Sequence, residues 1–216
     1  MSLVLVLCFV GVSLAQTAVL TAIRPQARQV LRRLRSPRLL LRAGCLLAGV
    51  LAVALPLFSL GGIWSWSWLS LLGADGGSLL LGTARADEAQ DHPIFAVAPY
   101  LFPLLAAAAM PVICLDEERL FRRGVDRSGP LGIAVRSVLF GVAHIVVGAP
   151  LAAQLALAGL GVAFAHEYRR AARAGEDPLL ASATLHCAYN YAVIATVAGV
   201  AAWAQIASKL GNAAAG

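Results

Sequence analysis

Residues 179–208, LLASATLHCAYNYAVIATVAGVAAWAQIAS, contain no aspartate, glutamate, lysine or arginine. An α-helix needs about 20 predominantly apolar residues to cross the hydrocarbon core of a bilayer, so this run is long enough to span it. Its Ala, Leu, Val and Gly residues lack the alternation of a barrel strand, which favours a helix. The run therefore predicts a membrane helix, and its polar interruptions His186 and Asn190 need a separate explanation.

Five further apolar runs precede this one, and each is long enough, or nearly so, to cross a membrane. They cover residues 2–23, 39–63, 93–115, 131–149 and 151–165. The sequence therefore predicts an all-α, polytopic membrane helix bundle with about six transmembrane helices. The pattern divides the chain into three regions. These are two N-terminal transmembrane helices with an external loop (1–92), a membrane core (93–208) and a short tail (209–216).

The composition agrees with a membrane protein. The chain is 60% hydrophobic and 13% charged, with a mean hydropathy of +0.79, whereas soluble domains average about 45–50% apolar and about 25% charged residues. The net charge of +6 could suggest nucleic-acid binding, but seven arginines are concentrated between Arg24 and Arg42, beside apolar runs. Basic residues in such places are typical of cytoplasmic loops. We therefore expect the lipid bilayer, and no nucleic acid, among the partners.

The connecting segments predict an orientation. Residues 24–42, 116–127 and 167–178 are rich in arginine, whereas residues 64–92 carry four acidic residues against Arg85 alone. The positive-inside rule then places both termini outside the cytoplasm. Nearly all of the basic residues are arginine, and Ala and Leu are abundant. This composition indicates a GC-rich coding bias, and hence a bacterial protein of the plasma membrane. The first run lacks the basic flank of a signal peptide, so we expect a retained helix.

Ionisable and amide side chains interrupt the apolar runs at three places. Two glutamates follow the third run in the sequence DEERLFRR, residues 116–123; His144 lies in the fourth run, and His186 and Asn190 lie in the sixth. Such groups are costly in lipid and face a cavity or a partner. Each has an ordinary structural explanation: a charge cluster at a helix end, a histidine bonded to a carbonyl, or polar contacts between helices. Their joint occurrence on three apolar helices favours one shared site.

The two glutamates are predicted to have different surroundings. Glu118 precedes Arg122 by four residues, the order that favours an ion pair along a helix. Glu117 is rotated by about 100° around the helix and faces another direction. One glutamate is therefore anchored by an arginine, and the other is free to act on a neighbouring group.

In order along the chain, the polar positions form the motifs EExxxR, FxxxH and HxxxN, each on its own predicted helix. Their members are Glu117, Glu118, Arg122, Phe140, His144, His186 and Asn190. The motifs, with the strings EERLFRRG and LFGVAH, resemble the CAAX protease and bacteriocin-processing family of intramembrane endopeptidases, which includes the Ras-converting CAAX endopeptidase. The resemblance covers about residues 93–208, which would be the catalytic core. Residues 1–92 carry no motif of this kind.

The resemblance implies hydrolysis of peptide bonds in a peptide or protein substrate at the membrane, of CAAX-like or bacteriocin type. Glu117 would act as the general base, and His144 would help to hold and activate the attacking water. The oxyanion of the tetrahedral intermediate would be stabilised by His186 and Asn190. The supporting residues would be Glu118, Arg122 and Phe140.

The residue types allow more than one chemistry. A carboxylate base with histidine and amide donors suffices for amide hydrolysis without a cofactor. Two histidines and a glutamate with water also form a common catalytic zinc set. We favour the metal-free reaction because HxxxN suits an oxyanion pair and the chain has no HExxH. A catalytically inactive scaffold on the same fold and a transporter with a proton relay are the competing functions. The oligomeric state is not indicated.

The polar residues can form one shared site only if they lie at the same depth in the membrane. Glu117 lies at the edge of the third run, whereas His144 lies about 20 Å along its helix from Leu131. Convergence requires either a break near Pro111 that turns DEERLFRR into the bundle, or helix ends several residues away from the hydropathy limits.

Overall fold

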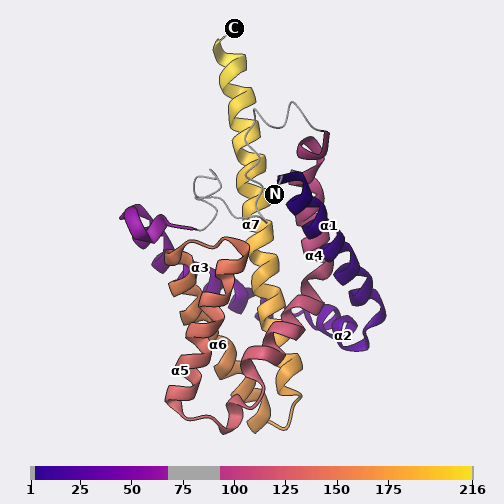
Figure 1. The fold of residues 1–216 in the computed structure, drawn as a ribbon, viewed down its shortest axis with the longest axis vertical. Coiled ribbons are helices and arrows are strands. Elements are labelled where there is room, and N and C mark those ends of the chain that lie inside the picture. The colour runs from indigo at the N-terminus through magenta and orange to yellow at the C-terminus, as the bar shows by residue number, and fades with distance from the viewer. Residues whose placement is uncertain (1–2, 68–92, 216) are drawn as a thin grey trace.

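The computed structural model describes residues 3–67 and 93–215, and every regular element in these residues is a helix (Figure 1). The α-helices are α1 (Leu3–Ile23), α2 (Pro25–Arg33), α3 (Pro37–Ser59), α4 (Pro93–Arg122), α5 (Pro130–Ala143), α6 (Leu151–Arg173) and α7 (Pro178–Ala215). Short 3₁₀ turns are η1 (Gly62–Ser65), η4 (Val125–Arg127) and η5 (His144–Val147). The predicted all-helical class is confirmed for these residues. The predicted external loop, residues 70–92, lies outside them.

Proline and glycine mark several helix ends. Pro25, Pro37 and Pro130 occupy the first turns of α2, α3 and α5, where a missing backbone N–H breaks no helical hydrogen bond. Gly124 follows α4 with a φ of 81°, a left-handed conformation that ends helices and that other residues rarely adopt. Each of the six apolar runs therefore becomes one helix, with ends set by local chemistry rather than by hydropathy.

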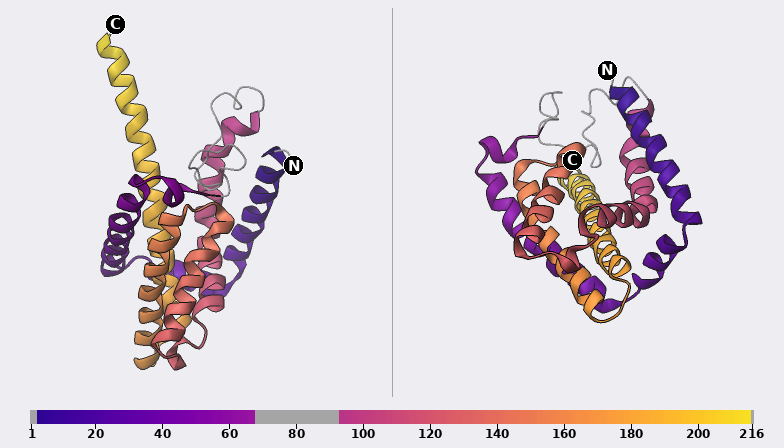
Figure 2. Two further views of the ribbon diagram at one scale, coloured as in Figure 1. Left: turned by 60° about the vertical axis from the view of Figure 1, so that its left-hand side comes forward. Right: turned by 60° about the horizontal axis from the view of Figure 1, so that its bottom comes forward.

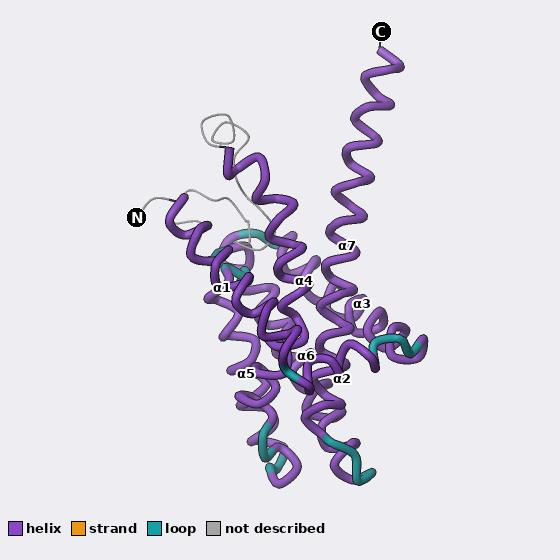
Figure 3. Tube along the Cα trace, turned by 90° about the vertical axis from the view of Figure 1, so that its right-hand side faces the viewer, coloured by secondary structure: helices purple, strands orange, loops and turns teal. Residues whose placement is uncertain are grey.

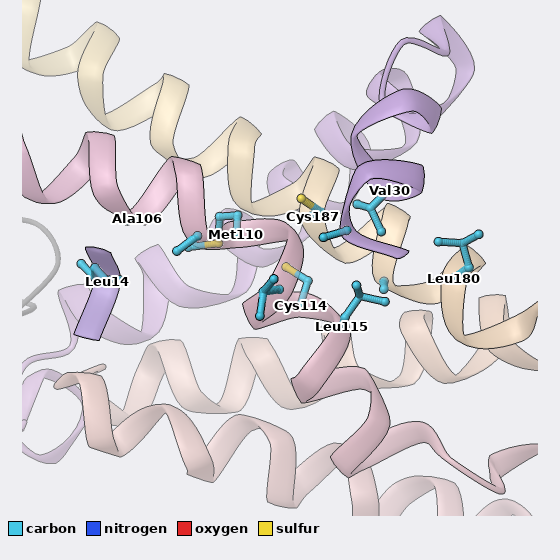
Figure 4. Packing of buried hydrophobic residues seen from close by; sticks show 12 residues of the cluster. Leu14, Val30, Ala106, Met110, Cys114, Leu115, Leu180 and Cys187 are labelled. Atoms are coloured by element: carbon cyan, nitrogen blue, oxygen red, sulfur yellow. The ribbon is translucent and has the colours of Figure 1, made fainter. Parts of the chain in front are cut away.

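The end of α4 differs from the sequence-based expectation. The helix continues through Pro111 to Arg122, so the break considered near Pro111 is absent. The ribbon nevertheless bends sharply beside Cys114 and Leu115, and this bend turns the last part of α4 into the bundle (Figures 1 and 4). Pro111 is fully buried, and α1 and α7 pack against α4 on its flanks. Packed neighbours allow a membrane helix to tolerate proline. The glutamates reach the bundle because α4 ends well beyond the hydropathy limit at Leu115.

The helices pack in two groups around α7. α1 lies against α4, α5 lies against α6, and α7 contacts α3, α4 and α6. Figure 1 and the right-hand view of Figure 2 show α1 and α4 on one side of α7, and α5 and α6 on the other. The 38 residues of α7 form one uninterrupted helix, whose last turns extend past the other helices (Figure 3). α1 and α3 thus pack in the same bundle as residues 93–208. The division of the chain into the regions 1–92, 93–208 and 209–216 stays a prediction.

Two apolar clusters fill the bundle. The first lies between α1, α2, α4 and α7, and includes Leu14, Val30, Met110, Cys114, Leu115 and Cys187 (Figure 4). The second joins α5, α6 and α7 through Phe140, Leu160, Phe164, Leu185 and Tyr189. The polar residues of interest lie between these two clusters, because they come from the facing sides of α4 and α7.

The membrane assignment is confirmed in its general form but not in the count of six spans. Within the described residues, Pro37–Ser59 and Pro130–Val147 are long and apolar enough to cross a membrane. A third span follows if Cys8–Ile23 and Pro25–Arg33, which meet at 84°, are counted together. The apolar residues exposed along these helices, such as Leu41, Leu55 and Val138, are suited to contact with lipid.

A close approach of α5 and α6 depends on Gly141. A Cβ atom at this position would overlap the carbonyl oxygen of Gln154 and would lie 2.8 Å from the backbone nitrogen of Ala158. Small residues let helix backbones approach within a membrane, where van der Waals packing largely drives association. Gly141 therefore sets the spacing that places Phe140, its neighbour in α5, between α6 and α7.

We expect Gly141→Ala to destabilise the protein by about 1–3 kcal/mol, because the added methyl group meets backbone atoms that cannot move aside. Gly159→Ala is the matched control, since a Cβ there meets nothing within 4 Å. Thermal unfolding of the purified protein in detergent measures both. Equal melting temperatures for the two variants would contradict this role of Gly141.

A charge cluster at the end of α6 connects this helix to α3. The buried carboxylate of Glu167 accepts a hydrogen bond of 2.6 Å from Arg42 Nη2 and bonds of 2.9 and 3.1 Å from Arg170. Burial opposes ionisation of Glu167, but the hydrogen bonds from Arg170 and Arg42 outweigh it and hold the pKa of this carboxyl below its ordinary value. The cluster lies beyond the apolar run 151–165, and it was not predicted from the sequence.

The lowered pKa of Glu167 predicts a pH-dependent contribution to stability. The contribution is complete above the ordinary glutamate pKa of about 4.3 and is lost as the pH falls through the lower, folded-state value. We expect Glu167→Gln to lower the free energy of unfolding by roughly 1–2 kcal/mol at neutral pH. The difference from wild type should shrink towards about pH 3.5. Thermal unfolding in detergent tests this, with Asp126→Asn as control, since Asp126 contacts only the exposed Arg127, at 3.7 Å, among the ion pairs of the described residues. A difference that grows on acidification would contradict the assignment.

Candidate active site

A buried carboxylate, Glu118, lies at the centre of a polar cluster between α4 and α7. Its Oε1 is 3.0 Å from His186 Nδ1, and its Oε2 accepts a hydrogen bond from the Ser182 hydroxyl. Arg122 Nε lies 3.6 Å from the same Oε2. All four side chains are almost completely removed from solvent. The predicted pairing of Glu118 with Arg122 is thus present, and two residues of α7 complete the surroundings of the carboxylate.

The guanidinium of Arg122 is held by charge and by an aromatic face rather than by hydrogen bonds. None of its three nitrogens has a hydrogen-bond partner in the described residues. Its carbon Cζ lies 4.8 Å from the centre of the Phe140 ring, a distance at which a cation is attracted to the ring. On another side, a Cβ at Gly161 would lie 3.1 Å from Arg122 Nη2. Gly161 therefore leaves the room that the guanidinium occupies.

Glu117 faces the other nitrogen of the same histidine. Its Oε2 is 3.6 Å from His186 Nε2 and has no hydrogen-bond partner in the described residues. Its side chain is 32% exposed, whereas that of Glu118 is not exposed at all. If Nδ1 carries the proton donated to Glu118, Nε2 has its lone pair available. His186 is thus placed between a buried, anchored carboxylate and a partly exposed one.

Aromatic rings fix the plane of the His186 imidazole. Phe164 of α6 stacks on it, with ring centres 4.5 Å apart and an angle of 27°. Phe140 of α5 meets it edge to face, with centres 5.5 Å apart. These contacts belong to the second apolar cluster, so the packing of α5, α6 and α7 determines the orientation of the imidazole. The sequence analysis placed Phe140 among the supporting residues but did not single out Phe164.

His144 also contacts the Phe140 ring, at 4.8 Å between ring centres. It stands where α5 passes into η5, and its Nδ1 is 2.8 Å from the Phe140 carbonyl oxygen. A carbonyl only accepts, so Nδ1 carries the proton and Nε2 is the acceptor of the neutral ring. No hydrogen bond or ion pair joins His144 to Glu117 or His186 in the described residues. Phe140 is therefore the link between the two histidines.

Asn190 contacts α4 at a point one helical turn farther along α7 than His186. Its Nδ2 lies 3.4 Å from Met110 Sδ and 3.4 Å from Cys114 Sγ, and sulfur is a weak hydrogen-bond acceptor. His186 and Asn190 share one face of α7, as their spacing indicates, and both meet α4. The structure thus brings Glu117, Glu118, Arg122, Phe140 and His186 together, while Asn190 lies one helical turn farther along α7.

Three further residues of the cluster were missed by sequence reasoning. Ser182 precedes His186 by four residues, so its spacing was a usable signal for a shared face. Phe164 and Gly161 lie in the apolar run of α6 and contribute through packing across helices. Nothing in a single sequence distinguishes them from other apolar positions, because their contacts depend on the tertiary structure.

The charged and sulfur side chains do not form an evident metal site. Within residues 3–67 and 93–215, no group of three or more His, Cys, Asp and Glu side chains has an arrangement that could hold a metal ion.

Comparison of the chain with family models, curated proteins and solved structures finds no match.

We expect Glu118→Gln to cost about 3–5 kcal/mol, because the loss of this carboxylate leaves the Arg122 cation buried and uncompensated. Asp116→Asn is the control, since Asp116 is an acidic residue of the same helix whose side chain is 50% exposed, and its loss should cost less than about 1 kcal/mol. Thermal unfolding in detergent compares the two. A Glu118→Gln protein as stable as the control would show that the Arg122 charge is compensated elsewhere.

Proposed function

We propose that this protein is a membrane-embedded endopeptidase, similar in its site to the CAAX protease and bacteriocin-processing family. Its substrate is a peptide or protein held at the membrane, of CAAX-like or bacteriocin type. The observation that carries the proposal is the pair of glutamates on either side of His186, one fully buried and one partly exposed. The motif order along the chain supports the same assignment.

In the proposed reaction, Glu117 takes a proton from a water molecule that attacks the carbonyl carbon of the scissile bond. The Glu117 side chain is 32% exposed, and its Oε2, which is buried beside His186, has no hydrogen-bond partner in the described residues. A carboxylate with an unbonded oxygen next to a histidine has the properties that a general base needs. The same proton then passes from Glu117 to the leaving amine. The carboxylate of Glu117 is thereby restored. Water has added across the peptide bond, which gives a carboxylic acid that keeps the second water proton and a free amine.

His186 would stabilise the charge that develops on the carbonyl oxygen. The hydrogen bond between its Nδ1 and Glu118 fixes the ring, and a proton taken up by Nε2 would make this nitrogen the donor to the oxyanion. A donor held in place before the reaction stabilises an oxyanion without reorganisation. Asn190 has a donor group for the same task. His144, whose Nε2 is an acceptor, would help to hold and activate the water, and a bound substrate would have to bring both side chains into reach. Ser182 and Arg122 hold Glu118 in place.

The proposed membrane arrangement has six spans, one for each of α1, α3, α4, α5, α6 and α7. The arginine-rich connections would face the cytoplasm of a bacterium, and both termini would lie outside it. Under this arrangement the DEERLFRR end of α4 faces the cytoplasm. The substrate would therefore approach the glutamates from the cytoplasmic side of the plasma membrane.

Loss of cleavage in a folded Glu117→Gln variant tests the proposed function. The full-length protein in lipid nanodiscs is mixed with peptides with and without a lipid anchor, and mass spectrometry detects the products. We expect cleavage by wild type and a decrease of about 10²–10⁴-fold in Glu117→Gln, because the amide cannot take up a proton. Asp116→Asn, an exposed neighbour on the same helix, should retain wild-type activity.

Two other outcomes distinguish the alternatives. If the wild type cleaves none of the peptides, the chain is a non-enzymatic scaffold on this fold and the peptidase assignment is overturned. If a chelator abolishes cleavage and added zinc restores it, the reaction is zinc-dependent, with Glu117 and the histidines as the ligands to test next.

A further inference from the structure

The short helix α2 differs from its neighbours in direction and in chemistry. It meets the apolar segment Cys8–Ile23 at 84°, and its sequence PQARQVLRR carries three arginines within nine residues. Ala27 and Val30 are completely buried against α4 and α7, whereas Arg28, Arg32 and Arg33 are exposed. A helix with this pattern, lying across the end of an apolar one, is suited to the membrane surface and not to the hydrocarbon core.

A cavity of about 430 Å³ lies next to α2, within the size range of small-ligand sites. It is bounded by α2, the end of α4, α6 and the start of α7. Its lining residues are Gln26, Arg119, Arg123, Tyr168, Asp177, Pro178 and Leu179. The cavity is therefore open at the same end of the bundle at which the arginines of α2 are exposed.

The lining of the cavity suits an anion. Arg119 is already engaged by Asp116, at 2.8 Å, and by the side-chain oxygen of Gln26. The carboxylate of Asp177 is also engaged, because its Oδ1 accepts a bond of 3.0 Å from the backbone nitrogen of Leu180. Arg123 makes no side-chain hydrogen bond or ion pair within the described residues. Arg123 is exposed and lines the cavity, so its guanidinium can exchange water for phosphate oxygens, which its planar donors fit well.

We propose that this cavity binds the phosphate of an anionic phospholipid headgroup, with Arg123 as the principal donor and the exposed arginines of α2 attracting the charged leaflet. Arginines near an anionic surface are attracted to it by their charge. A headgroup is preferred over a soluble anion because α2 brings the cavity to the surface where headgroups are concentrated. The inference does not depend on the peptidase reaction.

Lipid titration of the full-length protein in detergent tests the proposal. Phosphatidylglycerol carries a net negative charge, phosphatidylcholine carries the same phosphate without net charge, and inorganic phosphate carries the charge without the lipid. Native mass spectrometry and the thermal shift report binding of each. We expect phosphatidylglycerol to bind most tightly and Arg123→Gln to weaken that binding about tenfold, as expected for one lost charge-assisted hydrogen bond.

The control variant is Arg127→Gln, which removes the same charge from an exposed side chain outside the cavity. Its affinity for phosphatidylglycerol should remain within about twofold of wild type. Equal losses in the two variants, or equal binding of phosphatidylglycerol and phosphatidylcholine, would overturn the proposed site. If inorganic phosphate competes with the lipid at the concentrations at which the lipid binds, the ligand of the cavity is a soluble anion and not a lipid headgroup.

Discussion

The compensation of one buried charge, that of Glu118, is the constraint on which the bundle depends. A carboxylate without exposure to solvent is costly unless its oxygens are bonded and its charge is balanced. Ser182 and His186 supply the bonds and Arg122 supplies the opposite charge. Because these partners come from both α4 and α7, the two helices cannot shift along one another without breaking the network. The register of the central helix pair is thereby fixed.

The remaining packing serves this network. Membrane helices gain little from the hydrophobic effect when they associate, so close contact and polar bonds hold them together. Gly141 brings α5 against α6, and Gly161 leaves space for the Arg122 guanidinium. Phe140 then contacts the imidazoles of both His144 and His186. Small residues and aromatic rings thus determine where the ionisable groups lie, although they carry no chemistry of their own.

The sequence was sufficient for the helices and for part of the site, because both leave local signals. Apolar length predicts a membrane helix, and four-residue spacing predicts contacts along one helix, as Glu118 and Arg122 show. The end of α4, the helix α2 and the cluster around Glu167 could not be predicted in this way. Charged residues look alike in a sequence whether they are solvated or paired across helices. Which of them pair is decided by contacts between distant segments, such as Arg42 with Glu167.

The length of α7 makes the two ends of the bundle unequal. Its 38 residues reach about 57 Å, well beyond the roughly 30 Å of a hydrocarbon core. His186 lies only about 12 Å from the start of this helix at Pro178. The cluster therefore lies close to the Pro178 end of α7 and far from its C-terminal end. The bundle is thus asymmetric along the α7 axis, with the buried ionisable groups near one end and a long stretch of α7 without acidic residues beyond them.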